Sequence, residues 1–166
     1  HIKENIFIQK TSMINIRFNF PLVFLKGKLY AIGGRHFGGN EVAIRSECEF
    51  FDLKKNKWIA LPDMHISRSS CQALVYRGNI WIIGGNNPNR LGETIEYFDP
   101  IKNKWFLVEL NLPFDYFNHE ILSLKEDKIL IIGGYNSNSD NRNIHEIDLK
   151  EKTILSKGKL VNKRIS

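Results

Sequence analysis

The sequence has little of what several classes of protein require. Two cysteines in 166 residues are too few for a disulfide framework or a four-cysteine zinc site, and two free thiols suit a reducing compartment. The longest apolar runs, Ile80–Ile83 and Ile129–Ile132, end after four residues, far short of the roughly 18 that a membrane-spanning helix needs. Charged residues are mixed into the first ten positions, so no signal peptide can be recognised. We therefore expect a cytoplasmic protein with no membrane contact.

What is present is the composition of a folded chain. Hydrophobic residues make up 42% and charged residues 25%, which is too apolar for general disorder. The length alone predicts about one domain. The formal net charge of +6 makes nucleic acid or an acidic protein surface a partner to consider. The positions of the basic residues must decide between these partners and a simple solvated surface.

Three glycine pairs reveal an internal repeat. Gly84 lies 51 residues after Gly33 (84 − 33), and Gly133 lies 49 residues after Gly84 (133 − 84). In every unit the pair closes an apolar run and is followed by a phrase that ends in an aspartate. The complete pairs are Gly33-Gly34, Gly84-Gly85 and Gly133-Gly134. A repeat of this length indicates an array of similar structural units rather than one continuous domain.

Two further residue types follow the same spacing. In the first two units a tryptophan comes six residues after the aspartate, at Trp58 and Trp105. An arginine precedes each of these units, at Arg17 and Arg68, and a buried pairing to backbone or to a strand glutamate is the expected role of both. In the third unit Ile154 stands where the tryptophan would be. The third unit is therefore a degenerate copy.

Each unit has the pattern of four short strands and no helix. The apolar run before the glycine pair is typical of a strand that is buried on both faces. A four-stranded unit of about 50 residues whose strands need neighbours on both sides suits a propeller blade. The glycine pairs then lie where side chains are excluded and unusual backbone conformations are needed. The tryptophans are expected to pack between adjacent blades.

These landmarks resemble the kelch repeat. In the second unit they are Leu61-Pro62, Met64, Arg68, Gly78, the run Ile80–Gly85, the phrase Glu96–Asp99 and Trp105. The resemblance implies an all-β fold, a kelch-type β-propeller, with about three four-stranded blades of a larger ring of six. The sequence is similar to the repeats of kelch-like ubiquitin-ligase adaptors. The third unit departs from it, because Phe114–His119 contains no arginine and the tryptophan is missing.

The register of the repeat sets the expected blade boundaries. A shift of 51 residues superimposes Phe7 on Trp58, and Arg164 lies two units beyond Arg68, so both ends of the chain belong to incomplete units. The expected divisions are 1–18 for the end of a preceding blade, 19–66 and 67–114 for two full blades, 115–160 for the degenerate blade, and 161–166 for the start of the next.

The sequence gives no support for a catalytic site. The dipeptide His119-Glu120 begins a zinc-protease-like string, but the position of the second histidine is occupied by Ser123. The remaining histidines show no ligand spacing, and no glycine-rich loop precedes a helix. Cys48 and Cys71 are expected to be structural thiols. We therefore expect no enzyme activity, no metal and no cofactor.

The basic charge concentrates in one kind of turn. The lysines follow the aspartate of each unit, at Lys54, Lys55, Lys57, Lys102, Lys104, Lys150 and Lys152, and acidic residues interleave with them. Charged turns keep sheet edges soluble, so a solvated rim is the favoured interpretation. Aromatic residues do not alternate with these lysines as a nucleic-acid platform would require, which makes nucleic acid the weaker alternative.

Function is expected in the loops at one end of the propeller, which we call the loop face. It comprises the loops after the glycine pairs and the segments that enter each unit. The candidate partner-binding residues are Arg35, His36, Asn86, Asn87, Tyr135 and Asn136 from the loops, and Asn19, Ser70 and His119 from the entering segments. Arginine and tyrosine suit peptide recognition. For the asparagines, a role in turn geometry alone is the equally weighted alternative.

The resemblance implies a protein or peptide ligand on the loop face and a role in substrate recognition for a cullin-type ubiquitin ligase. Attachment to the cullin would need a BTB domain outside this chain. The alternative with the same fold is an actin-binding or cytoskeletal scaffold, which the basic turns would suit. A propeller-based enzyme is the alternative from a different class.

Overall fold

The computed structural model describes residues 8–38, 41–89, 91–124, 127–136, 139–140 and 142–162. These residues form three four-stranded antiparallel sheets and two small hairpins. No helix occurs among them, and hence none of sufficient length and apolarity to cross a membrane. The all-β prediction is confirmed.

Each large sheet is one blade, and its strands are hydrogen-bonded in chain order once the small hairpins are set aside. The first blade contains β1 (Leu22–Leu25), β2 (Lys28–Ile32), β5 (Cys48–Asp52) and β6 (Lys57–Leu61). The second contains β7 (Gln72–Tyr76), β8 (Asn79–Ile83), β9 (Ile95–Asp99) and β10 (Lys104–Leu107). The third contains β11 (Glu120–Ser123), β12 (Lys128–Ile132), β15 (Asn143–Asp148) and β16 (Thr153–Lys159).

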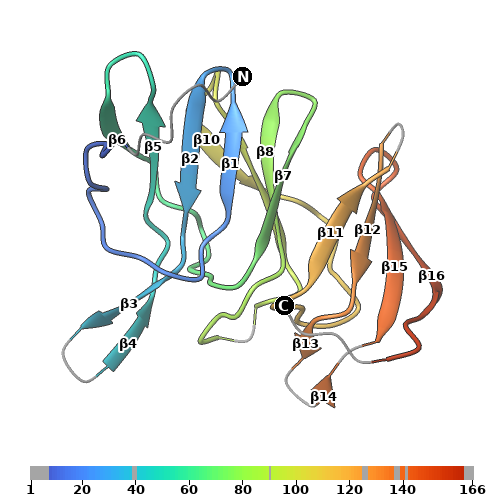
Figure 1. Ribbon diagram of the computed structural model, residues 1–166. Coiled ribbons are helices and arrows are strands. Elements are labelled where there is room, and N and C mark those ends of the chain that lie inside the picture. The colour runs from blue at the N-terminus through green and yellow to red at the C-terminus, as the bar shows by residue number, and fades with distance from the viewer. Residues whose placement is uncertain are drawn as a thin grey trace.

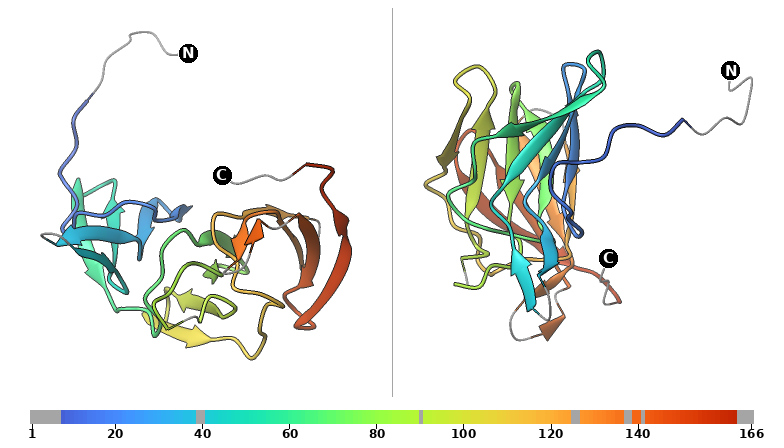
Figure 2. Two further views of the ribbon diagram at one scale, coloured as in Figure 1. Left: turned by 90° about the horizontal axis from the view of Figure 1, so that it is seen from below. Right: turned by 90° about the vertical axis from the view of Figure 1, so that its left-hand side faces the viewer.

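The two small hairpins are insertions after the glycine pairs. They are β3 (Arg35–Gly38) with β4 (Glu41–Ile44) in the first unit, and β13 (Tyr135–Asn136) with β14 (Ser139–Asp140) in the third. Both lie at the same end of the molecule (Figure 1). Seen along the perpendicular direction, the three blades follow one another in an arc (Figure 2). The described chain is therefore part of a propeller.

Two hydrophobic clusters hold the blades together, one in each space between neighbours. Alternate residues of β8 contribute to the two clusters: Ile80 and Ile82 belong to the cluster shared with the first blade, and Trp81 and Ile83 to the cluster shared with the third. All four are buried. The prediction that the apolar run is buried on both faces is confirmed for β8, because this strand lies between two other sheets; in β12 only alternate residues are buried.

The glycine pairs lie where three chain segments approach one another. Gly84 has a φ of +66°, and a Cβ there would meet the carbonyl oxygen of Tyr116 at 2.5 Å. Gly85 has a φ of +109°, and a Cβ there would meet the Cβ of Cys71 at 2.7 Å. Both the backbone conformation and the lack of space require glycine. The close approach allows Gly85 N to donate a hydrogen bond to Tyr116 O, which joins the second blade to the third.

In each of the first two blades a tryptophan donates a hydrogen bond to the segment that precedes the blade. Trp105 Nε1 donates to Pro62 O at 2.9 Å, and Trp58 Nε1 donates to Thr11 O at the same distance. Residues 11–18 contain no strand and follow the same course relative to the first blade as the 62–69 linker follows relative to the second: Ile14 N donates to Glu49 as His65 N donates to Glu96. Trp105 is 2% exposed between the blades, whereas Trp58 is only partly buried. Phe7 and Arg164, which set the expected outer boundaries, lie outside the described residues.

Candidate functional site

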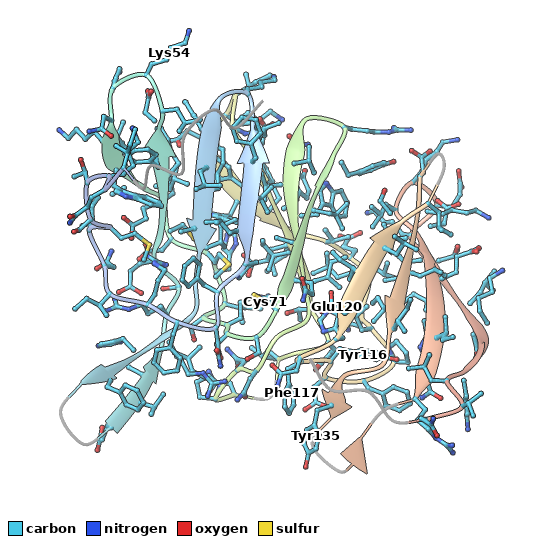
Figure 3. All side chains as sticks on the ribbon, viewed as in Figure 1. Lys54, Cys71, Tyr116, Phe117, Glu120 and Tyr135 are labelled. Atoms are coloured by element: carbon cyan, nitrogen blue, oxygen red, sulfur yellow. The ribbon has the colours of Figure 1, made fainter. Side chains whose placement is uncertain are left out.

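Three backbone bridges bring the loops and the entering segments to one end of the molecule. Phe18 pairs with Arg35, Ser69 with Asn86, and Phe117 with Tyr135. In each bridge the residues exchange two hydrogen bonds of 2.7 to 3.1 Å, so the start of one unit is tied to its own loop. Figure 3 shows Phe117 and Tyr135 at this end and Lys54, from one of the basic turns, at the opposite end. The loop face and the basic turns are therefore separate surfaces.

The entering segments also bond to one another across the blades. Ser70 N donates to Asn19 O at 2.8 Å, and Asn118 N donates to Ser70 O at 3.0 Å. All three residues have a left-handed backbone, with φ of 53°, 52° and 51°. They line a cavity of about 310 Å³ together with the residues that follow them. Asn19 and Ser70, predicted as site residues, thus lie close together.

His119 requires a correction. Gly133 lies 15 positions after Asn118 (133 − 118), one more than the 14 that separate Gly84 from Ser70, so Asn118 takes the place predicted for His119. His119 instead matches Cys71: the Cβ of each would be struck by a Cβ on the second glycine of its pair, at 2.7 Å. Its side chain is 0% exposed, so it lies in the interior and not on the loop face.

The buried His119 is uncharged at neutral pH. Burial lowers its pKa to about 3, and neither ring nitrogen has a hydrogen-bond partner within the described part of the chain. A charged imidazolium at this position would lose its hydration without gaining a counter-charge. The ring packs edge-on against Tyr116, with centroids 5.8 Å apart. His119 is a packing residue in this structure.

Arg35 connects the first two blades on the loop face. Its Nη2 donates to Ser70 Oγ at 3.3 Å, and its guanidinium lies 5.9 Å from the centre of the Phe18 ring. Phe18 also stacks on Phe37, whose side chain is 70% exposed at the tip of the β3–β4 hairpin. His36 is partly buried, and because it lies between Arg35 and Phe37 on β3 its side chain points to the other face of the hairpin. A guanidinium next to exposed aromatic surface can bind a carboxylate and pack against an apolar group at the same time.

The two loop asparagines have different surroundings. Asn86 is partly exposed and forms the backbone bridge to Ser69. Asn87 is 7% exposed, its amide nitrogen donates to Ser67 O, and its Oδ1 accepts from the backbone nitrogens of Asn89 and Leu91. The Asn87 side chain therefore holds the loop in shape, which is the turn-geometry alternative for this residue.

Tyr135 borders a cavity of about 390 Å³ between the second and third blades. Its ring lies 5.1 Å from that of Phe117, and Asn86 and Asp115 line the same cavity. Gly92 also lines the cavity. It packs so closely against the second glycine pair that a Cβ at this position would meet Gly85 O at 2.5 Å. The side chain of Asn136 lies outside what the structure describes. The cavity combines aromatic surface, an amide and a carboxylate, a mixture suited to a peptide rather than to a metal.

Two aromatic residues of the loop face were missed by the sequence reasoning: Phe18 and Phe117. A signal for both existed, because the dipeptide Phe-Asn occurs at Phe18-Asn19 and again at Phe117-Asn118. The described residues contain no group of three or more histidine, cysteine, aspartate or glutamate side chains that could hold a metal ion. The chemistry on offer is hydrogen bonding, charge and aromatic packing.

Comparison with known proteins agrees with this architecture. Residues 16–65 and 67–108 match the family described as Kelch motif. The fold is similar to that of a solved structure described as the structure of YjhT. The superposition covers 88% of this chain and 53% of that chain, with a TM-score of 0.78 and 16% sequence identity. That likeness shows a common fold.

Several curated proteins are similar in sequence. Spermatocyte protein spe-26 of Caenorhabditis elegans is 33% identical over 115 residues, which are 68% of this chain and 20% of that protein. Kelch-like protein 35 of Mus musculus is 32% identical over 131 residues, 78% of this chain and 22% of that protein. Kelch repeat and BTB domain-containing protein 8 of Homo sapiens is 28% identical over 110 residues, 66% and 17% respectively. The chain thus spans about a fifth of the length of these relatives.

Proposed function

Because this chain belongs to the kelch-repeat family, we propose that it is a non-catalytic protein-interaction module whose loop face binds a short peptide segment of a partner protein. The observation that carries this proposal is the arrangement of Arg35, Ser70 and Tyr135 on one end of three blades, with exposed aromatic side chains beside them. Binding residues on loops held by a rigid sheet framework are a common arrangement for recognition.

The chemistry of the loop face favours a peptide that carries a carboxylate. Arg35 is partly exposed and has a hydroxyl as its hydrogen-bond partner rather than an acid, so its charge is available to a ligand. The cavity beside Tyr135 offers an amide and two aromatic rings for the remainder of the peptide. Arginine and tyrosine are the residue types that most often dominate the energy of such contacts.

We further propose that the partner is a substrate delivered to a cullin-type ubiquitin ligase. Support comes from relatives whose names combine kelch repeats with a BTB domain. The cullin would be bound by a BTB domain outside these 166 residues. If the complete gene product carries no such domain, the ligase role is lost while the peptide-binding role remains.

The test is capture of candidate partners by the intact protein, followed by the charge reversal Arg35→Glu. We expect the variant to lose at least about tenfold in affinity, because the carboxylate then meets a like charge. Lys54→Glu, an equal charge reversal at the opposite end of the molecule, is the matched control and should bind as the wild type does. Undiminished capture by Arg35→Glu, or a large drop in its melting temperature, would contradict the proposal.

The basic turns favour a second candidate, an actin-binding or cytoskeletal scaffold. Their lysines lie at the end of the molecule opposite to the loop face, where they can meet an acidic filament without competing with a peptide (Figure 3). Cosedimentation with actin filaments would test this role. Reversal of Lys54, Lys55, Lys102 and Lys104 to glutamate should abolish it, and cosedimentation that persists would exclude this mode of binding.

A further inference from the structure

The two spaces between blades differ at one equivalent position. In the first space Trp105 pairs with Phe98 across the sheet and joins the buried cluster that contains Tyr30 and Phe50. In the second space Ile154 pairs with Ile147 in the same manner and is only partly buried. An isoleucine cannot fill the volume of an indole, nor can it supply the N–H that Trp105 gives to Pro62 O.

A cleft of about 500 Å³ lies between the second and third blades, beside Trp81, Tyr97 and Phe106; Ile154 itself is not among the residues that line it. On the second blade it is lined by the exit of β10, from Leu107 to Glu109, and Glu109 occupies the place that Pro62 has in the first blade. On the third blade it is lined by Leu149, Lys150 and Lys152 of the β15–β16 turn. The cleft opens toward the turn end of the molecule, away from the loop face.

Aromatic side chains form the wall of this cleft. Trp81, Tyr97 and Phe106 stack in sequence across β8, β9 and β10, with centroid distances of 5.1 Å at each step. Tyr76 meets the edge of Trp81 at 5.5 Å. The corresponding wall in the first space is Tyr30, Phe50 and Ile59, against which Trp105 packs in a single cluster. The wall of the cleft between the second and third blades is therefore suited to accept an aromatic ring.

The rim of the cleft is basic. Arg77, Lys150 and Lys152 line it, against one acidic residue, Glu109. Arg77 pairs with Asp127 at 3.0 Å and Lys150 with Glu151 at 3.3 Å, but both cations are more than half exposed. Lys152 has no ion pair among the residues that the structure describes, and the same holds for Lys104, which lies 5.6 Å from the Phe106 ring. A ligand with carboxylates beside an aromatic group matches this charge.

We propose that the cleft between the second and third blades is a binding site for a short acidic segment of a partner protein. An aromatic side chain of that segment takes the position that corresponds to the one Trp105 occupies between the first two blades. The aromatic group is anchored by Tyr97 and Phe106, and the flanking carboxylates are held by Lys150, Lys152 and Arg77. This site is independent of the loop face, and its failure would leave the proposed function untouched.

The experiment measures binding of synthetic peptides to the intact protein by fluorescence anisotropy. The probe is a labelled five-residue peptide with a central tryptophan and two glutamates on either side. We expect it to bind at least about tenfold more tightly than the same peptide with a central alanine, because a buried aromatic anchor dominates such contacts. Equal binding of the two peptides would overturn the proposal.

Two variants locate the site. Ile154→Trp should fill the cleft from within, abolish binding of the tryptophan peptide and leave the melting temperature equal or higher. The double variant Lys150→Glu/Lys152→Glu changes exposed side chains only and should weaken binding at least about tenfold. Lys54→Glu, in the equivalent turn of the first blade, is the control that should bind as the wild type does. Unchanged binding by both cleft variants would place the peptide elsewhere and refute the assignment.

Discussion

The first two blades and the third solve the same structural problem with different chemistry. Arg17 and Arg68 bond to backbone carbonyls and to Glu49 and Glu96, at 2.7 Å and 3.0 Å, in fully buried pairs. In the third blade Tyr116 stands in the arginine position, since its carbonyl accepts from Gly85 N as that of Arg68 accepts from Gly34 N. His145 takes the glutamate position, and Tyr116 Oη lies 2.6 Å from its Nδ1.

The difference shows that the fold needs a hydrogen-bonded pair at this position rather than a salt bridge. The carboxylates of the ionic pairs have further donors: Glu96 also accepts from the backbone nitrogens of His65 and Ile66. A buried charge needs such additional hydrogen bonds to offset its desolvation, whereas a neutral pair has a smaller desolvation cost. The third blade lacks the hydrogen bonds that the long arginine side chain makes to backbone carbonyls. In their place the rings of Phe114, Tyr116 and His145 pack against one another.

The largest expected effect comes from breaking an ionic pair. Arg68→Ala leaves Glu96 buried without its cation and should cost about 3–5 kcal/mol of unfolding free energy. The double variant Arg68→Tyr/Glu96→His, which copies the third blade, should cost clearly less. Urea unfolding of the intact protein measures both. If the double variant is as unstable as Arg68→Ala, the two kinds of pair are not interchangeable.

The second prediction compares the residues that fill the spaces between blades. Trp105→Ala removes a buried indole and its hydrogen bond and is expected to cost roughly 3–5 kcal/mol. Ile154→Ala, at the equivalent position of the third blade, should cost much less because Ile154 is partly exposed. Equal shifts of the unfolding midpoint would contradict the cleft described between the second and third blades.

The third prediction uses the neutral histidine of the third blade. The pKa of His119 falls from 6.5 to about 3 on burial, so the unfolded chain takes up a proton that the folded chain does not. Stability is therefore retained above pH 6.5 and is lost as the pH falls from 6.5 toward 3, by at most about 1.4 kcal/mol per pH unit. Between pH 6.5 and 5 the loss from this group should reach about 1.6 kcal/mol.

The control for this prediction is the residue of the second blade at the same position. His119→Cys should lower stability at neutral pH by opening a void, yet it should flatten the acid dependence between pH 6.5 and 5. His145, whose pKa is also lowered by burial, remains in this variant and keeps part of the slope. An unchanged slope would mean that His119 is not a buried neutral group.

The smallest effect is expected at the two thiols. Burial raises the pKa of Cys48 to about 12 and that of Cys71 to about 11, so neither is a thiolate at pH 8. Alkylation mapped by mass spectrometry should leave both unmodified in the folded protein and modify both in urea. Reaction of Cys71 in the folded state would show that the space between the first two blades opens more readily than its packing indicates.

Much of the fold could be predicted because the repeat records it in residue types. The apolar runs and the glycine pairs mark the central strands and their ends: β8 is buried on both faces, β2 over its last three residues and β12 at alternate residues, and a close approach follows each strand. The β3–β4 hairpin could not be predicted, because Arg35–Ile44 has no apolar alternation that would distinguish it from a loop. Its pairing depends on the two chain ends that the first blade holds side by side.

The candidate site was less predictable than the fold. The prediction placed His119 on the loop face because it assumed equal spacing to the glycine pair in every unit. The third unit has one additional residue in this interval, so Asn118 takes the loop-face position and His119 lies in the interior. His145 could be matched to the glutamate, because it lies three residues before Asp148 as Glu96 does before Asp99. The replacement of the arginine by Tyr116 was hidden, because tyrosine does not resemble arginine and only its contact with His145 reveals the equivalence.

The hydrogen bonds that Ser70 N donates to Asn19 O and Asn118 N donates to Ser70 O run entirely through the backbone. They require a side chain that tolerates a left-handed conformation but form no bond to that side chain, and asparagine and serine both appear there. Mutations at these positions can therefore alter what the loop face presents while the blades keep their alignment. A lineage of such proteins can change its binding specificity without first acquiring mutations that compensate for lost stability.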